Sequence, residues 1–207
     1  MTRSAACELL TIGHSNLAAD RFLGLLKDAG VTAVADVRSV PFSRWCPWFS
    51  GKALAQRLAG EAIAYIALGD ALGGRPRDPR LYRDGVADYE AMATSEEFAA
   101  GLQRVVDEMA HHRVCLLCAE REPLDCHRCL LVGRALVARG LALGHIRPDG
   151  RIEPPRRRSN ACSRSPVARQ IFFAMATSAS PTPTAGGRKP SRRVSRPDGN
   201  SSPSPTR

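Results

Sequence analysis

Short apolar runs alternate with segments of helical periodicity along most of the chain, and this alternation constrains the fold more than any other feature. An uncharged run of about four to eight residues between helices is typical of a strand buried on both faces of a parallel sheet. Strands that alternate with helices indicate an α/β domain. We therefore expect one three-layer domain with a mostly parallel sheet of about five strands. The predicted strands span residues 9–13, 31–37, 62–68, 114–119 and 141–146.

The segments between these runs carry signals for helix starts and stops. Gly30 and Gly140 each follow an amphipathic segment, where glycine commonly ends a helix. Thr94 and Glu97 have the spacing of a capping box, and Asp125 can cap the segment that follows it. The predicted helices span residues 18–29, 51–60, 86–93, 94–110 and 125–139.

The excess of basic over acidic residues lies entirely in the C-terminal part of the chain. The formal net charge is +10, yet residues 1–150 contain 18 Lys and Arg against 18 Asp and Glu. Residues 151–207 contain 12 and 2 of these. Ser, Pro, Thr, Arg and Gly dominate beyond residue 154, a composition that offers too little apolar surface to form a core. We predict a neutral domain over residues 1–154 and a basic, disordered tail over 155–207.

The cysteines and the apolar runs indicate where the protein works. The chain contains seven cysteines, an odd number, and we find no secretory signal. Reduced thiols in the cytoplasm therefore fit better than a disulfide framework. The apolar runs are far shorter than the ~20 residues that a membrane span requires. We expect no membrane partner, and the oligomeric state stays open.

Polar side chains gather where the predicted strands end. The carboxyl ends of parallel strands share one edge of a sheet, which is where open α/β sheets place their sites. The stretch 113–129 is the richest, because an apolar strand leads there into a loop of acid, base, thiol and imidazole. The predicted catalytic residues are Glu120, Asp36, His14 and Cys126; the predicted substrate-binding residues are Ser15, Asn16, Arg38, Ser43, Arg44, His127 and Arg128.

Two carboxylates are candidates for proton transfer or for orienting another group. Glu120 sits where an apolar strand meets a loop, a place where burial can raise a carboxylate pKa, and it is the best general acid/base candidate. A salt bridge to a neighbouring arginine is the alternative. Asp36 lies within a strand, so it must be paired or hydrogen-bonded, and Arg38 or Arg44 is its expected partner.

Three arginines could converge on an anion. The guanidinium groups of Arg38, Arg44 and Arg128 suit a phosphate or a carboxylate, and a helix start after Asp125 would add backbone N–H groups. An ordinary surface charge is the alternative for each of them. We expect an anionic small molecule or a nucleic acid as the ligand.

The paired cysteines resemble a zinc knuckle, but strand geometry argues against one. Cys115 and Cys118 would lie in a strand, where residues three apart point to opposite faces. The gap to Cys126 and Cys129 is also shorter than the usual ~12–20 residues. We therefore predict no metal and no cofactor. Cys126 at a helix start could be a reactive thiol, the alternative being a small buried residue.

The loop over residues 69–79 is long and rich in Gly, Pro and Arg. Long loops inside compact domains are usually functional or mobile. It matches neither a P-loop nor a dinucleotide-binding fingerprint, so any contact with phosphate is only weakly indicated.

Several motifs together resemble the bacterial and archaeal domain-of-unknown-function 488 (DUF488) family over roughly residues 8–153. They include Thr11-Ile-Gly-His-Ser-Asn16, Asp36-Val-Arg-Ser39, Leu117-Cys-Ala-Glu120 and Cys126-His-Arg128. The resemblance implies a compact α/β domain with these motifs in one cleft, and it implies no established reaction. Cys115 and Cys129 are not part of the motifs.

The residues favour an enzyme, a hydrolase or group transferase, acting on an anionic nucleotide-like or nucleic-acid substrate. In this hypothesis the arginines bind the anion and Glu120 transfers the proton. Asp36 and His14 orient or polarise the reacting groups. One alternative is a non-catalytic protein that binds nucleic acid through its basic tail. Another is thiol-dependent chemistry at Cys126.

Overall fold

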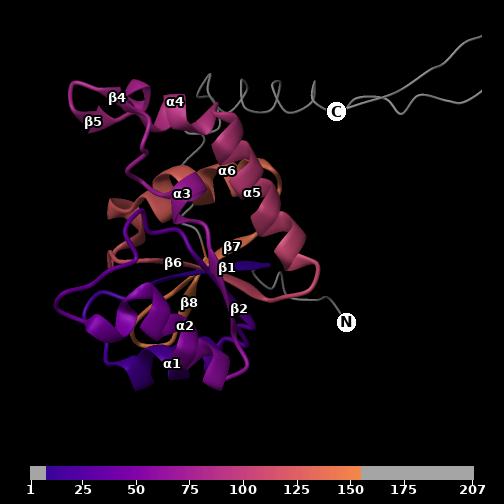
Figure 1. The fold of residues 1–207 in the computed structure, drawn as a ribbon. Coiled ribbons are helices and arrows are strands. Elements are labelled where there is room, and N and C mark those ends of the chain that lie inside the picture. Colours follow the sequence, from indigo (N-terminus) through magenta and orange to yellow (C-terminus); the bar gives the residue numbers. More distant parts are fainter. Residues whose placement is uncertain (1–7, 155–207) are drawn as a thin grey trace, which may run out of the picture.

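A six-stranded sheet forms the middle of the molecule, in the order β3-β2-β6-β1-β7-β8. The computed structural model describes residues 8–154. The first five strands in this order are parallel and β8 pairs antiparallel with β7 (Figure 1). The predicted α/β fold with a mostly parallel sheet is confirmed. The strands are β1 (Leu9–Gly13), β2 (Ala33–Asp36), β3 (Ala64–Ala67), β6 (Val114–Cys118), β7 (Leu143–Ile146) and β8 (Ile152–Glu153).

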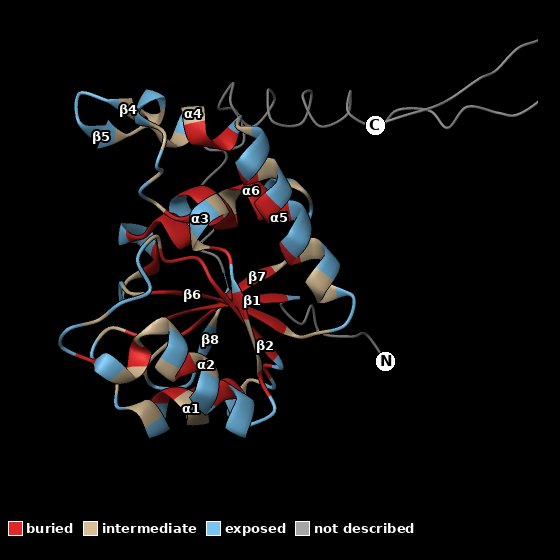
Figure 2. Cartoon of the chain, viewed as in Figure 1, coloured by how far each residue is buried: buried red, intermediate tan, exposed pale blue. Residues whose placement is uncertain are grey.

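Helices cover both faces of this sheet, which gives the predicted three layers. Helices α1 (Ala19–Asp28) and α2 (Gly51–Gly60) pack on one face. Helices α3 (Gly69–Leu72), α4 (Tyr89–Ala93), α5 (Glu96–Met109) and α6 (Arg134–Ala138) pack on the other. Figure 2 shows that the four central strands β2, β6, β1 and β7 are buried along their length, as expected for apolar strands covered by helices on both faces.

Strand β6 lies between β1 and β2 and brings their ends together. Its residues alternate between the two cores, with Val114 and Leu116 on the α5 side and Cys115 and Leu117 on the α1 side. Gly13 at the end of β1 is level with Cys118, and Asp36 at the end of β2 is level with Leu117. The segments that follow these three strands therefore emerge side by side.

Two predicted helix starts differ from the structure. Ser95 and not Thr94 caps α5, and its hydroxyl accepts a hydrogen bond from the N–H of Phe98. Thr94 instead donates its hydroxyl to the carbonyl of Ala91 at the end of α4. Residues 86 and 87 belong to β5 (Val86–Ala87), which pairs with β4 (Tyr82–Arg83), so α4 begins only after Asp88 caps it.

The predicted helix over 125–139 is built from several pieces. Asp125 is the last residue of a 3-10 turn over Pro123–Asp125 and does not cap the helix. A π-helical turn covers Arg128–Gly133 and leads into α6. Gly133 lies close to the carbonyl of Arg128, where a Cβ atom would come within 2.9 Å of the oxygen. Gly30 and Gly140 end their helices at positive φ, as predicted.

Among residues 8–154, no helix has the length and apolar character to cross a bilayer. The predicted disordered tail over 155–207 lies outside the described residues, so that prediction and the nucleic-acid hypothesis built on it remain predictions.

Candidate functional site

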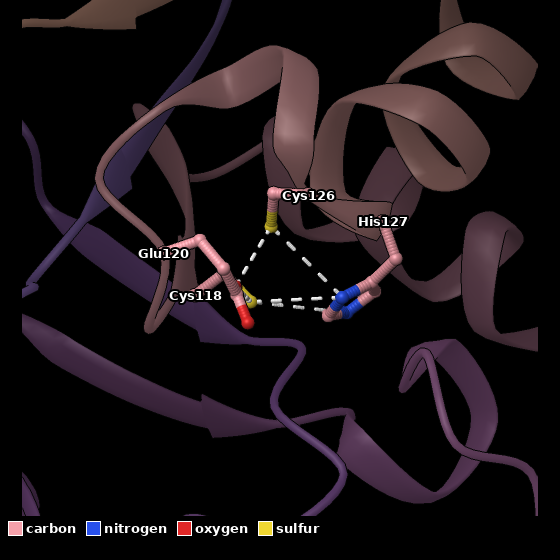
Figure 3. Close-up of side chains that lie close together, drawn as sticks. All are labelled: Cys118, Glu120, Cys126 and His127. Carbon is pink, nitrogen blue, oxygen red and sulfur yellow. Dashed lines mark hydrogen bonds between the residues drawn. The ribbon is translucent and has the colours of Figure 1, made fainter.

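Four side chains with chemically reactive groups gather at the carboxyl end of β6. Cys118 is the last residue of the strand, Glu120 follows it, and Cys126 and His127 begin the next helical segment. One ligand-type atom from each of the four lies within 4.8 Å of the others (Figure 3). We call this group the Cys118 cluster.

The Cys118 cluster combines three buried side chains with one that is exposed to solvent. Cys118 and Cys126 are each 2% exposed and His127 is 8% exposed, whereas Glu120 is an exposed residue. The Oε2 atom of Glu120 lies 2.8 Å from the sulfur of Cys118 and 3.0 Å from that of Cys126. The imidazole Nδ1 of His127 lies 3.6 and 3.9 Å from the same two sulfurs. A small reactant could therefore approach the buried groups past Glu120.

The ring of His127 is held by the end of β2 and by the loop after α3. Its Nε2 lies 2.8 Å from the carbonyl oxygen of Val37. A carbonyl only accepts hydrogen bonds, so Nε2 carries a proton there and a neutral ring has its lone pair on Nδ1, toward the sulfurs. Gly74 lies against the ring, since a Cβ atom at Gly74 would come within 2.8 Å of it.

The two thiols of the cluster have very different acidities. The hydrogen bond from Cys118 lowers the pKa of Cys126 to about 6; burial opposes this shift, while His127 and the charge of Arg128 add to it. The same hydrogen bond, together with burial, raises the pKa of Cys118. Burial alone would lower the pKa of His127, but its hydrogen bond with Cys126 and the charge of that group raise it.

Glu120 is a carboxylate and not the neutral acid that burial would favour. Burial raises its pKa, but hydrogen bonds from the thiols of Cys118 and Cys126 outweigh this effect and bring the pKa to about 2. The direction expected from the sequence is therefore reversed. At neutral pH this group can accept a proton but has none to give.

Asp36, Arg38 and His14 form a separate buried network beside the cluster. Both carboxylate oxygens of Asp36 accept hydrogen bonds from Arg38, the shortest being 2.6 Å, and Tyr65 donates its hydroxyl to the same group at 2.8 Å. Arg38 also lies 3.1 Å from Nε2 of His14, whose Nδ1 is 2.9 Å from the carbonyl of Ser15. The predicted ion pair of Asp36 with Arg38 is confirmed.

This network holds the end of β2 and leaves His14 uncharged. Burial and the neighbouring Arg38 lower the pKa of His14 to about 4. Its ring stacks on Phe49 at 4.3 Å between centroids. With both nitrogens engaged, His14 supports the fold next to the cluster and does not belong to it.

Arg128 is buried beneath the loop that carries Glu120. It is 1% exposed, and its guanidinium donates to the carbonyl oxygens of Glu120 at 2.7 Å and Arg121 at 3.2 Å. The Nε of Arg128 has no hydrogen-bond partner among the described residues. Of the three arginines predicted to bind an anion, Arg38 and Arg128 thus donate their hydrogen bonds to groups of the protein, and Arg44 is exposed.

The other predicted binding residues shape the surrounding loops. Arg44 stacks over the ring of Trp45 at 4.8 Å. The hydroxyl of Ser43 accepts a hydrogen bond from the N–H of Cys46. Ser15, at positive φ, donates its hydroxyl to the exposed Asn16 at 3.5 Å. None of these contacts joins the Cys118 cluster.

Strand geometry explains which cysteines meet. Cys115 is fully buried in the core on the α1 side, as predicted, and Cys129 lies 3.9 Å from His145. The four cysteines therefore do not form a knuckle. Cys118, which the predicted site omitted, could have been found from its position, because it is the last strand residue before the loop that carries Glu120.

A family comparison matches most of this architecture. A family model described as "Domain of unknown function DUF488" matches residues 18–135, more than half of the chain. The chain belongs to the DUF488 family. Searches of curated proteins and of solved structures found no match.

The DUF488 match contains the whole Cys118 cluster together with Asp36 and Arg38. It stops before His145 and does not reach His14 at its other end. The resemblance seen in the motifs is thus confirmed. A reaction for the DUF488 domain must be inferred from the geometry of its residues.

Proposed function

We propose that this DUF488 domain is an enzyme, a hydrolase or group transferase, that acts at the Cys118 cluster on an anionic, phosphate-bearing substrate. One observation carries the proposal: a solvent-facing carboxylate converges with two thiols and an imidazole at the carboxyl edge of a parallel sheet. This edge is where α/β folds bind their ligands. Buried polar groups that meet without a structural reason are candidates for function.

Glu120 is the proton acceptor in this proposal. It is ionised at neutral pH and is the exposed member of the cluster. It can take a proton from a water or hydroxyl group as the oxygen of that group attacks the substrate's phosphorus. The phosphorus–oxygen bond to the leaving group breaks as the new bond forms, and the leaving oxygen takes a proton from solvent. The Arg128 hydrogen bond to the backbone of Glu120 fixes where the carboxylate lies.

Exposed arginines near the cluster supply the attraction for an anion. Arg121 directly follows Glu120, and Arg75 follows Gly74, which packs on His127. The N–H of Arg75 donates to the hydroxyl of Ser39, so the loop is fixed beside the end of β2. Arginine suits phosphate oxygens because its guanidinium presents paired donors.

The test measures phosphate release from para-nitrophenyl phosphate, its bis ester and a panel of nucleoside phosphates. We expect turnover of at least one compound, and a loss of about 100-fold or more in kcat for Glu120→Gln. Glu97→Gln, at an exposed position in the first turn of α5, is the control and should retain full activity. An active wild type with an equally active Glu120→Gln would overturn the assignment of Glu120, and an inactive wild type would overturn the substrate class.

Thiol chemistry at Cys126 is a second candidate function. The N–H of Arg128 lies 3.4 Å from the Cys126 sulfur, and this contact favours a thiolate. Iodoacetamide labelling followed by peptide mass spectrometry tests it, with Cys129 as an internal reference. Cys129 is the more exposed of the two, yet burial raises its pKa. Faster labelling of Cys126 supports a reactive thiolate, and faster labelling of Cys129 rules it out.

A further inference from the structure

We propose that Cys118, Cys126 and His127 bind a zinc ion through Sγ, Sγ and Nδ1, with a fourth position open toward Glu120. Two sulfurs and one imidazole nitrogen are the donor set that zinc favours. Sites with three protein ligands and one open position are typical of catalytic zinc. This proposal deepens the function proposed above, although metal binding itself can be measured without it.

The donor atoms already have the spacing of a tetrahedral site. With zinc–sulfur bonds of about 2.3 Å and a zinc–nitrogen bond of about 2.1 Å, a tetrahedron separates sulfur from nitrogen by roughly 3.6 Å. The observed separations from His127 Nδ1 are 3.6 Å to Cys118 and 3.9 Å to Cys126. Both separations are within a few tenths of an ångström of the tetrahedral value, and the two sulfurs lie within 4.8 Å of each other.

The orientation of His127 matches that of a metal ligand. Histidines that bind metals usually donate their other ring N–H to a carbonyl or a carboxylate, which fixes the ring and the tautomer. The hydrogen bond from Nε2 of His127 to Val37 does this. It leaves the Nδ1 lone pair facing the two sulfurs, as Figure 3 shows.

The charges around the cluster also suit a divalent cation. Two thiolates balance the charge of Zn²⁺, so the ion brings no net charge into the buried side of the site. The N–H of Arg128, 3.4 Å from Cys126 Sγ, stabilises a sulfur ligand from outside the coordination shell. Each ligand rests on a fixed element, Cys118 on β6 and the other two at the start of a helical segment.

Glu120 lies at the open side of this site. Its Oε2 accepts hydrogen bonds from the two thiols at 2.8 and 3.0 Å, and both bonds are lost when the metal replaces the thiol protons. The carboxylate, on the solvent side of the sulfurs, is then left to accept a hydrogen bond from a water at the fourth position. A water bound to the metal there would be acidified, and Glu120 could accept its proton. The nucleophile that the proposed hydrolase requires would thus come from the metal-bound water.

The test loads chelator-treated, full-length protein with ZnCl₂ or CoCl₂. We expect one ion per chain and cobalt absorption bands typical of tetrahedral thiolate coordination. Cys118→Ser, Cys126→Ser and His127→Asn should each lower zinc affinity by about 100-fold or more. Cys129→Ser, in the same segment but outside the ligand set, is the matched control and should bind as wild type does. No stoichiometric binding, or an equal loss in Cys129→Ser, would overturn the proposal.

Two further measurements keep the proposal testable if ligand variants misfold. Zinc should protect Cys118 and Cys126 of the wild type from alkylation and leave the labelling of Cys129 unchanged; equal labelling with and without zinc contradicts the site. Glu120→Gln should retain zinc affinity within about threefold, because it is not a ligand. Zinc binding without any phosphatase activity would refute the proposed function alone, whereas activity that survives metal removal would refute the metal's part in it.

Discussion

Gly13, the last residue of β1, lies directly against the backbone carbonyl of Glu120 on the loop that follows β6. A Cβ atom at Gly13 would overlap the carbonyl oxygen and would also come within 3.1 Å of the Arg128 guanidinium. Neither neighbour can move away easily, because one is backbone and the other is buried. The lack of a side chain at residue 13 therefore sets the position of Glu120.

We predict that Gly13→Ala lowers the free energy of unfolding by about 1–3 kcal/mol, the range found for overpacked cores. Urea denaturation measures the change. Gly24→Ala is the control, because a Cβ atom at this position in α1 meets nothing within 4 Å. It should leave stability unchanged or raise it by up to about 1 kcal/mol. A Gly13→Ala protein as stable as wild type would show that the loop can shift freely.

Asp36→Asn should cost about 3–5 kcal/mol, since it leaves Arg38 buried without its carboxylate partner. Chemical denaturation of the variant gives the value. Asp70→Asn removes an exposed partner of Arg77 and should change stability by less than about 0.5 kcal/mol. Adding Arg38→Met to Asp36→Asn should recover part of the loss; a strictly additive double variant would mean that the pair does not interact.

Acid should destabilise the fold between about pH 6.5 and pH 4. Burial, followed by the nearby arginines, lowers the pKa of both His14 and His145 to about 4. Below pH 6.5 these two histidines become protonated in the unfolded chain but stay neutral in the folded chain. The free energy of unfolding therefore decreases as the pH is lowered, by up to about 1.4 kcal/mol per pH unit for each histidine. The loss is complete near pH 4.

His145→Asn should make this pH dependence shallower. Asparagine can keep the hydrogen bond to Thr11, which the ring makes through Nδ1 at 2.7 Å, but it does not titrate. His111→Asn, at an exposed position, is the comparison. Thermal melts at half-unit pH steps follow both variants. Identical slopes for wild type and His145→Asn would contradict the assignment.

Gly74→Ala should weaken zinc binding by about tenfold or more with little change in global stability. The added Cβ would lie 2.8 and 2.9 Å from two atoms of the His127 ring and would displace the ring. Gly60→Ala, with open space around its Cβ, is the control. Zinc titration of both proteins compares them. Wild-type affinity in Gly74→Ala would show that the loop after α3 does not position the ring.

The sheet could be predicted from the sequence, because short apolar runs between helices are typical of strands buried in a parallel sheet. The sequence also separated Cys115 from Cys118 correctly, since alternation along a strand is a local property. The predicted strand ends differ from the observed ones by a residue or two, because the ends of secondary-structure elements fray. The antiparallel β8 was missed because a pair of residues carries no periodicity.

The site depended on contacts that no local pattern encodes. The pairing of Asp36 with Arg38 could be expected from the sequence, but the burial that leaves Arg38 bound to Asp36 and His14 could not. Cys118 and His127 meet because of the 3-10 turn at Pro123 and the π-helical turn after it, and both depend on packing. The pKa of Glu120 follows from two thiols that come together only in the folded chain.

The position of β6 between β1 and β2 also determines the order in which the molecule can be completed. The two flanking strands leave the ribosome long before Val114, and until then nothing fills the gap between them. Pairings across about a hundred residues are slow to form. The chain loses the entropy of closing a long loop before the paired strands gain any stabilising contact. A nascent or truncated chain that ends before β6 therefore leaves β1 unpaired on both edges and β2 unpaired on one, and it is prone to aggregate. The four side chains of the Cys118 cluster can come together only after β6 has inserted between β1 and β2.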